Sequence, residues 1–491
     1  MEKIVIIGEH PIANDLIRQY KARGKEVAVI ANYRQPARTL SESISRCTEL
    51  CLLSDINKGD PEEADNEAVA LIGMLADALD EVQYQEQKLV CHLLVRSQQV
   101  LQMLHTTDFR ETIRQKIDVY PFTLAETWSR SIVLDYEPIT LQSEKHVHLV
   151  IFGLGEIAEL VAIQAAYVAH YPNYIRNHSQ RTRITMVDMQ AEQKCKIFIR
   201  RFQHLFDNSY YRVVRPSEEK AVTYFHQPMY EGLREDFVDV EWEFVEAEVW
   251  NADLREKLKM WAEDKTQLLT VVMADNDANK NAAQALLLPQ ELYQHDIPIH
   301  KYSQEYKGYD VSLPLVRMAK NINYIYDRCY EENDATWNGE IRHSVEIDKA
   351  ERERSWAKLK NVKRMSSICN AMTIAGKMRS IGLEEGDWDK FYDIPQQDIE
   401  ILAQVEHNRW SVEELILGFR PCTDDEQDKI SADVKTQKNA YKSRKIHYDL
   451  RAYDELRPDG TGKPVQIYDF CLSSCLPLIA KAFADEEGGE A

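Results

Sequence analysis

The sequence predicts an α/β protein with two doubly wound parallel sheets in tandem, followed by a small, mainly α-helical domain. Two apolar strands, which begin near Lys3 and His148, each lead into a glycine-containing loop and then a helical pattern. Strand and helix patterns alternate up to about Asn323, as parallel sheets require for their crossover helices. Beyond about Trp337 helices and charged loops replace this alternation, which indicates a domain of another class.

The first sheet is predicted from strands separated by helical patterns. A helix at residues 13–22 joins the first two strands, and a longer helix runs from Glu62 to about Tyr84. The expected strands are residues 3–8, 26–31, 49–53 and 88–95.

The loop after the first strand departs from a nucleotide-binding fingerprint. It runs from Gly8 to Ala13 and has His10 where a second glycine should allow a pyrophosphate to approach. Asn32 stands roughly where an acidic ribose ligand is expected. We therefore predict a degenerate partner domain, and the alternative of a nucleotide bound here stays open.

The second sheet carries a fingerprint in its proper context, and we predict a Rossmann-like fold for it. Residues 148–158 read HLVIFGLGEIA, an apolar strand that runs into a glycine loop and a helix. Gly153 allows the tight turn, Gly155 lets backbone N–H groups approach a pyrophosphate, and the small Ala158 allows close packing of helix and sheet. The helix N-terminus would add partial positive charge beside the phosphates.

Acidic residues follow the neighbouring strands of the second sheet. Asp188 ends the strand at 183–188, where a carboxylate could hold ribose hydroxyls. Asp275 and Asn276 follow the strand at 268–274, and they could contact a ligand or simply cap the next helix. The predicted ligands of NAD, NADP or another adenine nucleotide are Gly153, Gly155, Glu156, Ile157, Ala158, Asp188, Asp275 and Asn276. The alternative is a fold whose glycines serve only the turn.

Two such units in tandem resemble the TrkA-N family of nucleotide-binding domains, which gate potassium transport. The resemblance depends on Gly153, Gly155, Ala158, Asp188 and the segment 275–279, and it implies a bound nucleotide in the second unit. In the first unit only Gly8 and Ala13 match.

The third region contains a helical pattern at residues 399–418 and a dense charge run at 346–360, which we interpret as a solvated helix face or connector. Its Leu-Ala-x-x-x-His-x-x-Trp helix, Leu402 to Trp410, resembles the ryanodine-receptor repeat domain. Gly418-Phe419 and a Lys-x-His-x-x-Leu-x-x-Tyr segment, Lys445 to Tyr453, match as well. Two positions depart from that family: Glu414 replaces a basic residue and Tyr448 a proline.

The second resemblance implies a module that recognises a ligand or a protein partner. Trp410 and Tyr453 could stack on a purine, and arginine side chains could meet its phosphates. The alternative places the aromatic side chains in a core. The predicted ligand-binding residues of this module are His407, Arg409, Trp410, Arg420, Lys445, His447, Arg451 and Tyr453.

We expect the domain boundaries to follow these changes of pattern. The expected parts are residues 1–142 (degenerate Rossmann-like), 143–335 (nucleotide-binding), 336–397 (helical connector), 398–482 (ryanodine-receptor-like) and 483–491 (acidic tail).

Composition limits the class of partner. The 491 residues carry a net charge of −21, with 44 % hydrophobic and 29 % charged residues, so broad nucleic-acid binding is not expected. No apolar run has the length of a membrane helix, and a strand begins at once, so we expect a cytoplasmic protein without a signal peptide. The nine scattered cysteines are expected to be reduced and mostly buried, and they suggest no metal site.

No sequence motif of a catalytic site is present, so enzymatic activity is uncertain and not favoured. We hypothesise a nucleotide-binding sensor, with the nucleotide in the second sheet and a nucleotide messenger or partner at the helical module. The combination resembles components of bacterial defence signalling, and a homodimer is expected. The alternatives are a regulatory subunit of a potassium transporter, an oxidoreductase using His178 or His204, and an effector that cleaves NAD.

Overall fold

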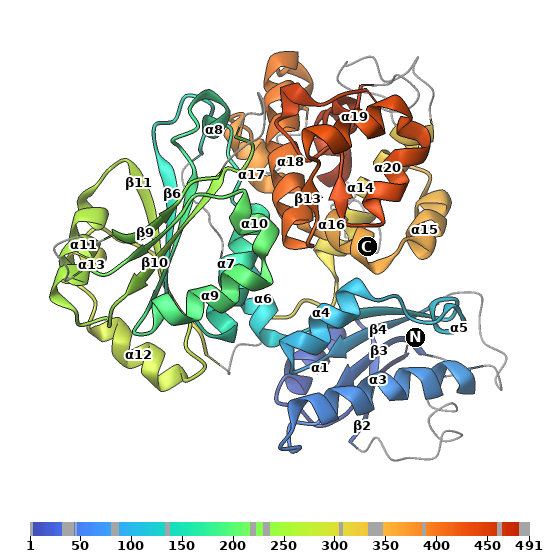
Figure 1. The fold of residues 1–491 in the computed structure, drawn as a ribbon. Helices are drawn as coiled ribbons and strands as arrows, with labels where there is room; N and C mark the ends of the chain where they lie inside the picture. Colours follow the sequence, from blue (N-terminus) through green and yellow to red (C-terminus); the bar gives the residue numbers. More distant parts are fainter. Residues whose placement is uncertain are drawn as a thin grey trace. The chain divides into compact units, whose positions relative to one another are not determined.

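The computed structural model describes residues 3–31, 44, 47–79, 88–132, 138–216, 222–228, 236–303, 308–331, 347–384, 389–458 and 464–480. The chain divides into two compact units (Figure 1). Unit 1 comprises residues 1–131, 304–314 and 349–365, and unit 2 comprises residues 132–303, 315–348 and 366–491. Each unit contains a sheet built on parallel strands with helices around it, so the expected α/β class is confirmed.

The sheet of unit 1 has five parallel strands in the order β2-β1-β3-β4-β5. This order places a topological switch point between β1 and β3, where the connections leave in opposite directions. Four strands lie where the apolar runs predict them, whereas β5 (IDVYPF) was not predicted. The strands are β1 (Lys3–Ile7), β2 (Glu26–Ile30), β3 (Cys47–Leu53), β4 (Leu89–Leu94) and β5 (Ile117–Phe122).

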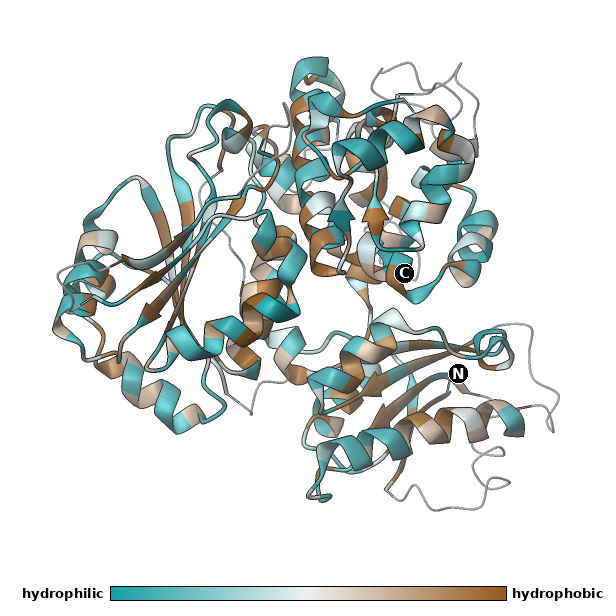
Figure 2. Ribbon diagram, in the orientation of Figure 1, coloured by the Kyte–Doolittle hydropathy of each residue, from teal (hydrophilic) through white to brown (hydrophobic). Residues whose placement is uncertain are grey.

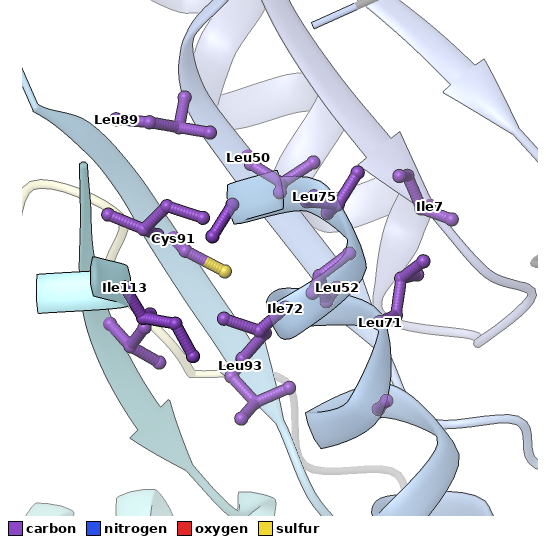
Figure 3. Close-up of a cluster of buried hydrophobic side chains, with 14 of the residues drawn as sticks. Ile7, Leu50, Leu52, Leu71, Ile72, Leu75, Leu89, Cys91, Leu93 and Ile113 are labelled. Carbon is purple, nitrogen blue, oxygen red and sulfur yellow. The ribbon is translucent and has the colours of Figure 1, made fainter. Parts of the chain in front are cut away.

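Helices cover both faces of this sheet. Helices α1 (Ala13–Ala22) and α6 (Leu124–Ser131) pack on one face, and α3 (Pro61–Ala78), α4 (Gln98–Thr106) and α5 (Glu111–Arg114) on the other. Helix α3 begins where the Asp60 carboxylate accepts the Glu62 N–H, with proline at its first position. Figure 3 shows the side chains of Leu71, Ile72 and Leu75 from α3 above the apolar strands.

A late segment of the chain completes the α1 face of unit 1. Tyr309 stacks on Phe122, with ring centroids 3.6 Å apart, and its Oη lies 2.7 Å from Nδ1 of His92. The Gln19 amide donates to the Tyr309 carbonyl oxygen at 2.7 Å and accepts the N–H of Val311 at 3.2 Å. Apolar and polar contacts together hold this segment against the sheet.

Helix α15 (Lys349–Lys358) also belongs to unit 1 and corresponds to the predicted charge run. Trp356 is only 1 % exposed, and its Nε1 donates to Tyr120 Oη at 3.3 Å. Arg364 donates to the Asp118 carboxylate at 2.6 Å. The charge run therefore contains a buried tryptophan that packs within unit 1. The interpretation as a solvated helix face or connector did not predict this contact.

The sheet of unit 2 has seven strands in the order β12-β11-β6-β7-β10-β8-β9, parallel except for β9. The neighbours β6 and β11 define its switch point. Strands β8, β9 and β10 were not predicted from the sequence. The strands are β6 (His146–Phe152), β7 (Thr182–Asp188), β8 (Tyr211–Val214), β9 (Val222–His226), β10 (Val240–Glu246), β11 (Gln267–Met273) and β12 (Ile299–Lys301).

Helices lie on both faces of the second sheet as well (Figure 1). Helices α7 (Glu156–Val168) and α9 (Ala191–Arg201) cover one face, and α11 (Ala252–Glu263), α12 (Ala278–Leu286) and α13 (Gln290–Gln294) the other. Two short helices, α8 (Asn173–Arg176) and α10 (Gln203–Asp207), lie in connections. Figure 2 shows apolar strands in both units.

Polar side chains form a continuous hydrogen-bonded row across five strands of this sheet. Glu243 on β10, 3 % exposed, accepts from Arg212 on β8 at 2.9 Å and from Thr185 on β7 at 3.0 Å. The row continues from Thr185 to His148 Nε2 at 2.8 Å and from His148 Nδ1 to Gln267 on β11 at 2.7 Å. Burial lowers the pKa of His148 to about 3, so this imidazole is neutral at pH 7.

The remaining part of unit 2 is mostly helical. The long helix α18 (Gln396–Ile416) packs against α21 (Gln466–Ser474) and also against α7, α8 and α10. The other elements are α14 (Pro314–Glu331), α17 (Ile374–Ser380), η1 (Lys390–Asp393), β13 (Arg420–Pro421), α19 (Asp424–Ala432), α20 (Val434–Lys442), β14 (Ile446–His447) and η2 (Tyr453–Glu455). Helix α16 (Asn361–Ala371) begins in unit 1 and ends in unit 2.

Two further expectations concern cysteines and membranes. All nine cysteines are buried and free, as predicted. Among the residues described, no helix combines the length and the apolar character needed to cross a membrane. The acidic tail at 483–491 lies outside the described residues.

We predict that Tyr309 stabilises unit 1. Tyr309→Ala should lower the free energy of opening the β4 and β5 amides by about 3–5 kcal/mol, because a buried aromatic ring is lost. Tyr309→Phe keeps the stacking and should cost only about 1 kcal/mol for the hydrogen bond to His92. Hydrogen exchange monitored by mass spectrometry measures both, and unchanged protection in Tyr309→Ala would contradict the role of this segment.

Candidate functional site

The candidate site lies at the carboxyl ends of β6, β7 and β11 in unit 2. Helix α7 follows β6 on one face of the sheet and α12 follows β11 on the other, so the chain diverges at this point. In open α/β sheets such a divergence leaves a crevice in which ligands bind. The glycine loop between β6 and α7 therefore stands at the switch point.

The two glycines of the loop have different roles. Gly153 has φ +117°, and a Cβ there would lie 3.3 Å from the Ala274 carbonyl oxygen, so the turn itself needs glycine. Gly155 precedes α7 with φ −116°, which any residue adopts, and a Cβ there would meet no atom within 4 Å. The space in front of Gly155 is therefore open toward the N-terminus of α7.

The other predicted residues of the loop divide between core and surface. Ile157 and Ala158 are buried, and the Ala158 Cβ lies 3.6 Å from the Cβ position of a residue at 153, which is the close packing that the fingerprint predicts. Glu156 is exposed in the first turn of α7. Its negative charge interacts favourably with the positive end of the helix dipole, but it would repel a phosphate bound at the same place.

Two aspartate–lysine pairs flank the glycine loop. Asp188 at the end of β7 accepts from Lys194 Nζ at 2.7 Å and from the Gln190 N–H at 2.9 Å. Asp275 after β11 accepts from Lys280 Nζ at 2.5 Å and from a backbone N–H in the same turn. Burial raises the pKa of Asp275, but Lys280, this N–H and the charge of Lys194 together lower it, so both lysines act on one carboxylate.

The turn after β11 is held by residues that sequence reasoning missed. The fully buried Asn281 accepts the Asp275 N–H at 2.9 Å and donates to the Asp275 carbonyl oxygen at 2.8 Å. Asp277, not Asp275, caps α12 through the N–H groups of residues 279 and 280. Asp275 is therefore not a helix cap, and Asn276 is exposed beside it.

Apolar side chains at the same edge were also missed. Met189 follows Asp188 and is 62 % exposed, and Trp250 follows β10 and is 56 % exposed. The Ala247 N–H donates to the Asp188 carbonyl oxygen at 3.2 Å, which joins the loops after β7 and β10. The signal was hidden because β10 reads VEWEFVE, with acids at alternate positions, and was not identified as a strand.

The corresponding loop of unit 1 carries the His10 side chain in place of a second glycine. Gly8 has φ +108°, as a tight turn needs, and the Ile12 N–H donates to His10 Nδ1 at 3.2 Å. The His10 side chain thus takes part in the turn of unit 1, whereas the corresponding turn of unit 2 contains two glycines.

In the helical module one predicted ligand-binding side chain, Arg409, belongs to a buried cluster of charges. Arg409 is 1 % exposed and donates to the carboxylates of Glu406 and Glu413. Lys377 donates to Glu406 at 2.6 Å. Burial raises the pKa of Glu406, but the charges of Arg409 and Lys377 lower it to about 2. Lys377, Glu406, Arg409 and Glu413 form a buried cluster of two positive and two negative side chains. Arg409 is therefore engaged within the protein.

The His407 imidazole lies beside both aromatic rings predicted to stack on a purine. Its ring centroid is 5.5 Å from that of Trp410 and 5.7 Å from that of Tyr453. Its Nε2 lies 2.8 Å from the Arg451 carbonyl oxygen and its Nδ1 3.3 Å from the Asp469 carboxylate. Burial lowers the pKa of His407, but these two acceptors raise it overall.

The remaining residues of this predicted site differ in how far they are exposed to solvent. Arg420 donates to both carboxylate oxygens of Glu426, at 2.7 and 2.8 Å. Lys445 is exposed, with its Nζ 4.2 Å from the centroid of the Phe419 ring. His447 and Arg451 are buried, and His447 packs edge-on against Trp410. The structure thus brings five of these residues into mutual contact beside α18, namely His407, Trp410, His447, Arg451 and Tyr453. Arg409, Arg420 and Lys445 contact other residues instead.

No family model matches this chain, and no curated protein is significantly similar to it in sequence. The resemblances to nucleotide-binding and ryanodine-receptor-type domains therefore stay predictions from sequence motifs.

We predict that Glu406 stabilises unit 2 in its ionised form. Its pKa of about 2 in the fold lies below the value of about 4.3 in unfolded chains, so its contribution of about 3 kcal/mol is present above pH 5 and disappears as the pH falls toward 2. Glu406→Gln should cost about 3–5 kcal/mol at pH 7, because it leaves buried cations unpaired. It should also flatten the loss of stability between pH 5 and 2.

Denaturant unfolding of unit 2 at several pH values measures both effects. Glu400→Gln, at an exposed position of the same helix, is the matched control and should change little. An equal effect of the two substitutions would contradict a stabilising role for the buried cluster.

Proposed function

We propose that unit 2 binds an adenine nucleotide, NAD or NADP among them, at the switch point between β6 and β11, and that the chain acts as a nucleotide sensor. The open space in front of Gly155 carries this proposal. Gly153 has a steric reason to be glycine, whereas Gly155 has none within the described part of the chain. A glycine that the fold does not need, at the N-terminus of a long helix, is what close approach of a pyrophosphate requires.

The flanking residues suit the rest of such a ligand. Asp188 would accept ribose hydroxyls, and the exposed surfaces of Met189 and Trp250 offer apolar contacts for a base beside it. Lys194 and Lys280, whose side chains are 38 % and 52 % exposed, could turn from their aspartates to phosphate oxygens. Glu156 would oppose phosphate, so the backbone N–H groups of the loop would make the pyrophosphate contacts.

A sensing role is favoured over simple binding by the packing of α18. Helix α7 begins at the glycine loop and packs against α18, the helix that carries the buried charge cluster. A ligand that favours one position of α7 would thereby change the surroundings of the helical module. Such coupling needs a different ligand affinity in the two arrangements. As part of the same proposal, the helical module recognises a second nucleotide or a protein partner. That partner would belong to a bacterial defence system or to a transporter.

We predict that Gly155→Leu abolishes nucleotide binding without unfolding unit 2. The new side chain enters open space and leaves the turn intact, but it occupies the position of the pyrophosphate. Calorimetric titration with NAD, NADP, ADP-ribose and ATP measures affinity, and mass spectrometry of molecules released from the denatured wild-type chain identifies a retained ligand. Ala252→Leu, at the exposed first turn of α11, is the control. Equal affinity in Gly155→Leu and wild type would refute this site.

We further predict that Asp188 selects against a 2′-phosphate. Asp188→Ser should weaken NAD about tenfold, because hydrogen bonds to a charged acceptor are lost, and should weaken NADP less because Lys194 is released. The ratio of the two dissociation constants tests this, with Asp253→Ser on the exposed face of α11 as control. An unchanged ratio would exclude Asp188 from the ribose site.

A further inference from the structure

A cavity lies in unit 1, away from the carboxyl edge of its sheet. It has a volume of about 340 Å³ and opens between α3 and the chain from the end of α4 to α5. Val69, Leu104, Phe109 and Ile113 line it, and all four also belong to or pack on the apolar core. Figure 3 shows Ile113 among the core side chains. The floor of the cavity is therefore apolar and firmly supported.

Gly73 is the feature of this cavity that the fold does not explain. It lies inside α3, where glycine is the poorest helix former except proline. It has no positive φ, and the nearest atom to a Cβ built there is Nη2 of Arg110, at an ordinary contact distance of 3.6 Å. A side chain would be tolerated by its neighbours but would project toward Arg110 at the cavity. The glycine thus keeps the cavity open.

Arg110 supplies a positive charge at the mouth. It is exposed, and its guanidinium makes no hydrogen bond or ion pair with any residue that the structure describes. The acidic residue of the lining, Asp108, is engaged elsewhere, because its Oδ1 accepts the Asn361 N–H at 2.8 Å. Met103, 47 % exposed, adds an adaptable apolar wall.

We propose that this cavity binds an amphipathic anion, with its apolar body between α3 and α5 and its single anionic group on Arg110. The volume is at the lower end of that of small-molecule sites, which are mostly apolar with a few polar groups that fix orientation. A carboxylate suits a guanidinium because the two can form paired hydrogen bonds. The ligand class therefore differs from the nucleotide proposed for unit 2.

The test uses the full-length chain and two probes of opposite charge. n-Octanoate and n-octylamine compete with 8-anilinonaphthalene-1-sulfonate, whose fluorescence rises when it binds apolar surface. We expect octanoate to displace the dye at a concentration at least tenfold lower than octylamine. Arg110→Gln should weaken octanoate about tenfold and leave octylamine unchanged, because one charge-assisted contact is lost.

Substitutions on α3 locate the binding. Gly73→Leu should fill the cavity and abolish displacement by octanoate, whereas Asn66→Leu, on the exposed part of the same helix, should not. Gly73→Ala, which favours the helix and makes only an ordinary contact, should weaken octanoate while the protein stays folded. Equal competition by the two probes, or unchanged octanoate affinity in both Gly73 variants, would overturn the proposal. Gly155→Leu should leave octanoate binding intact, which separates this site from the nucleotide site.

Discussion

Four charged side chains enclosed around α18 form the constraint on which the helical half of unit 2 depends. Lys377, Glu406, Arg409 and Glu413 are each nearly inaccessible to water, and each ion would be unstable there without its partners. Their charges balance only if α17 and α18 keep one relative position. Such a cluster adds little stability compared with an apolar core, but it tolerates few alternative packings. The long helix that touches α7, α8, α10 and α21 is therefore set in one register.

The glycine loop between β6 and α7 contains two glycines with different physical roles. Gly153 answers a steric demand inside the protein, since the Ala274 carbonyl oxygen stands beside it. At Gly155 a Cβ would meet no atom within 4 Å, so the described part of the chain does not require glycine there. The same distinction separates Gly73, which the geometry of α3 does not require, from glycines at positive φ.

Much of the fold could be predicted because its strands are continuous apolar runs followed by helical patterns. The strand at 240–246 was not predicted, since a buried acid such as Glu243 is tolerated only where Arg212 and Thr185 reach it from other strands.

Tyr309 and Trp356 were not predicted as part of the first unit for a related reason. Their partners lie far away in the sequence, and no local pattern shows that they belong to the first sheet. Within the candidate site, local spacing singled out residues 153–158 and Asp188 but gave no sign of Asn281 or Trp250, which long-range contacts and an unpredicted strand bring to the same edge.

The inclusion of residues 304–314 and 349–365 in unit 1 has a consequence for synthesis on the ribosome. The sheet of this unit is complete by residue 131, yet Tyr309 and Trp356, which cover parts of it, are made much later. At roughly 5–20 residues per second, about 10 to 50 s separate the emergence of these parts. During that time unit 2 is itself being made, so the amino-terminal unit finishes folding only after most of its successor has left the ribosome. Completion of the first unit is therefore delayed in this chain, although its last residue, Met365, still precedes the last segment of unit 2.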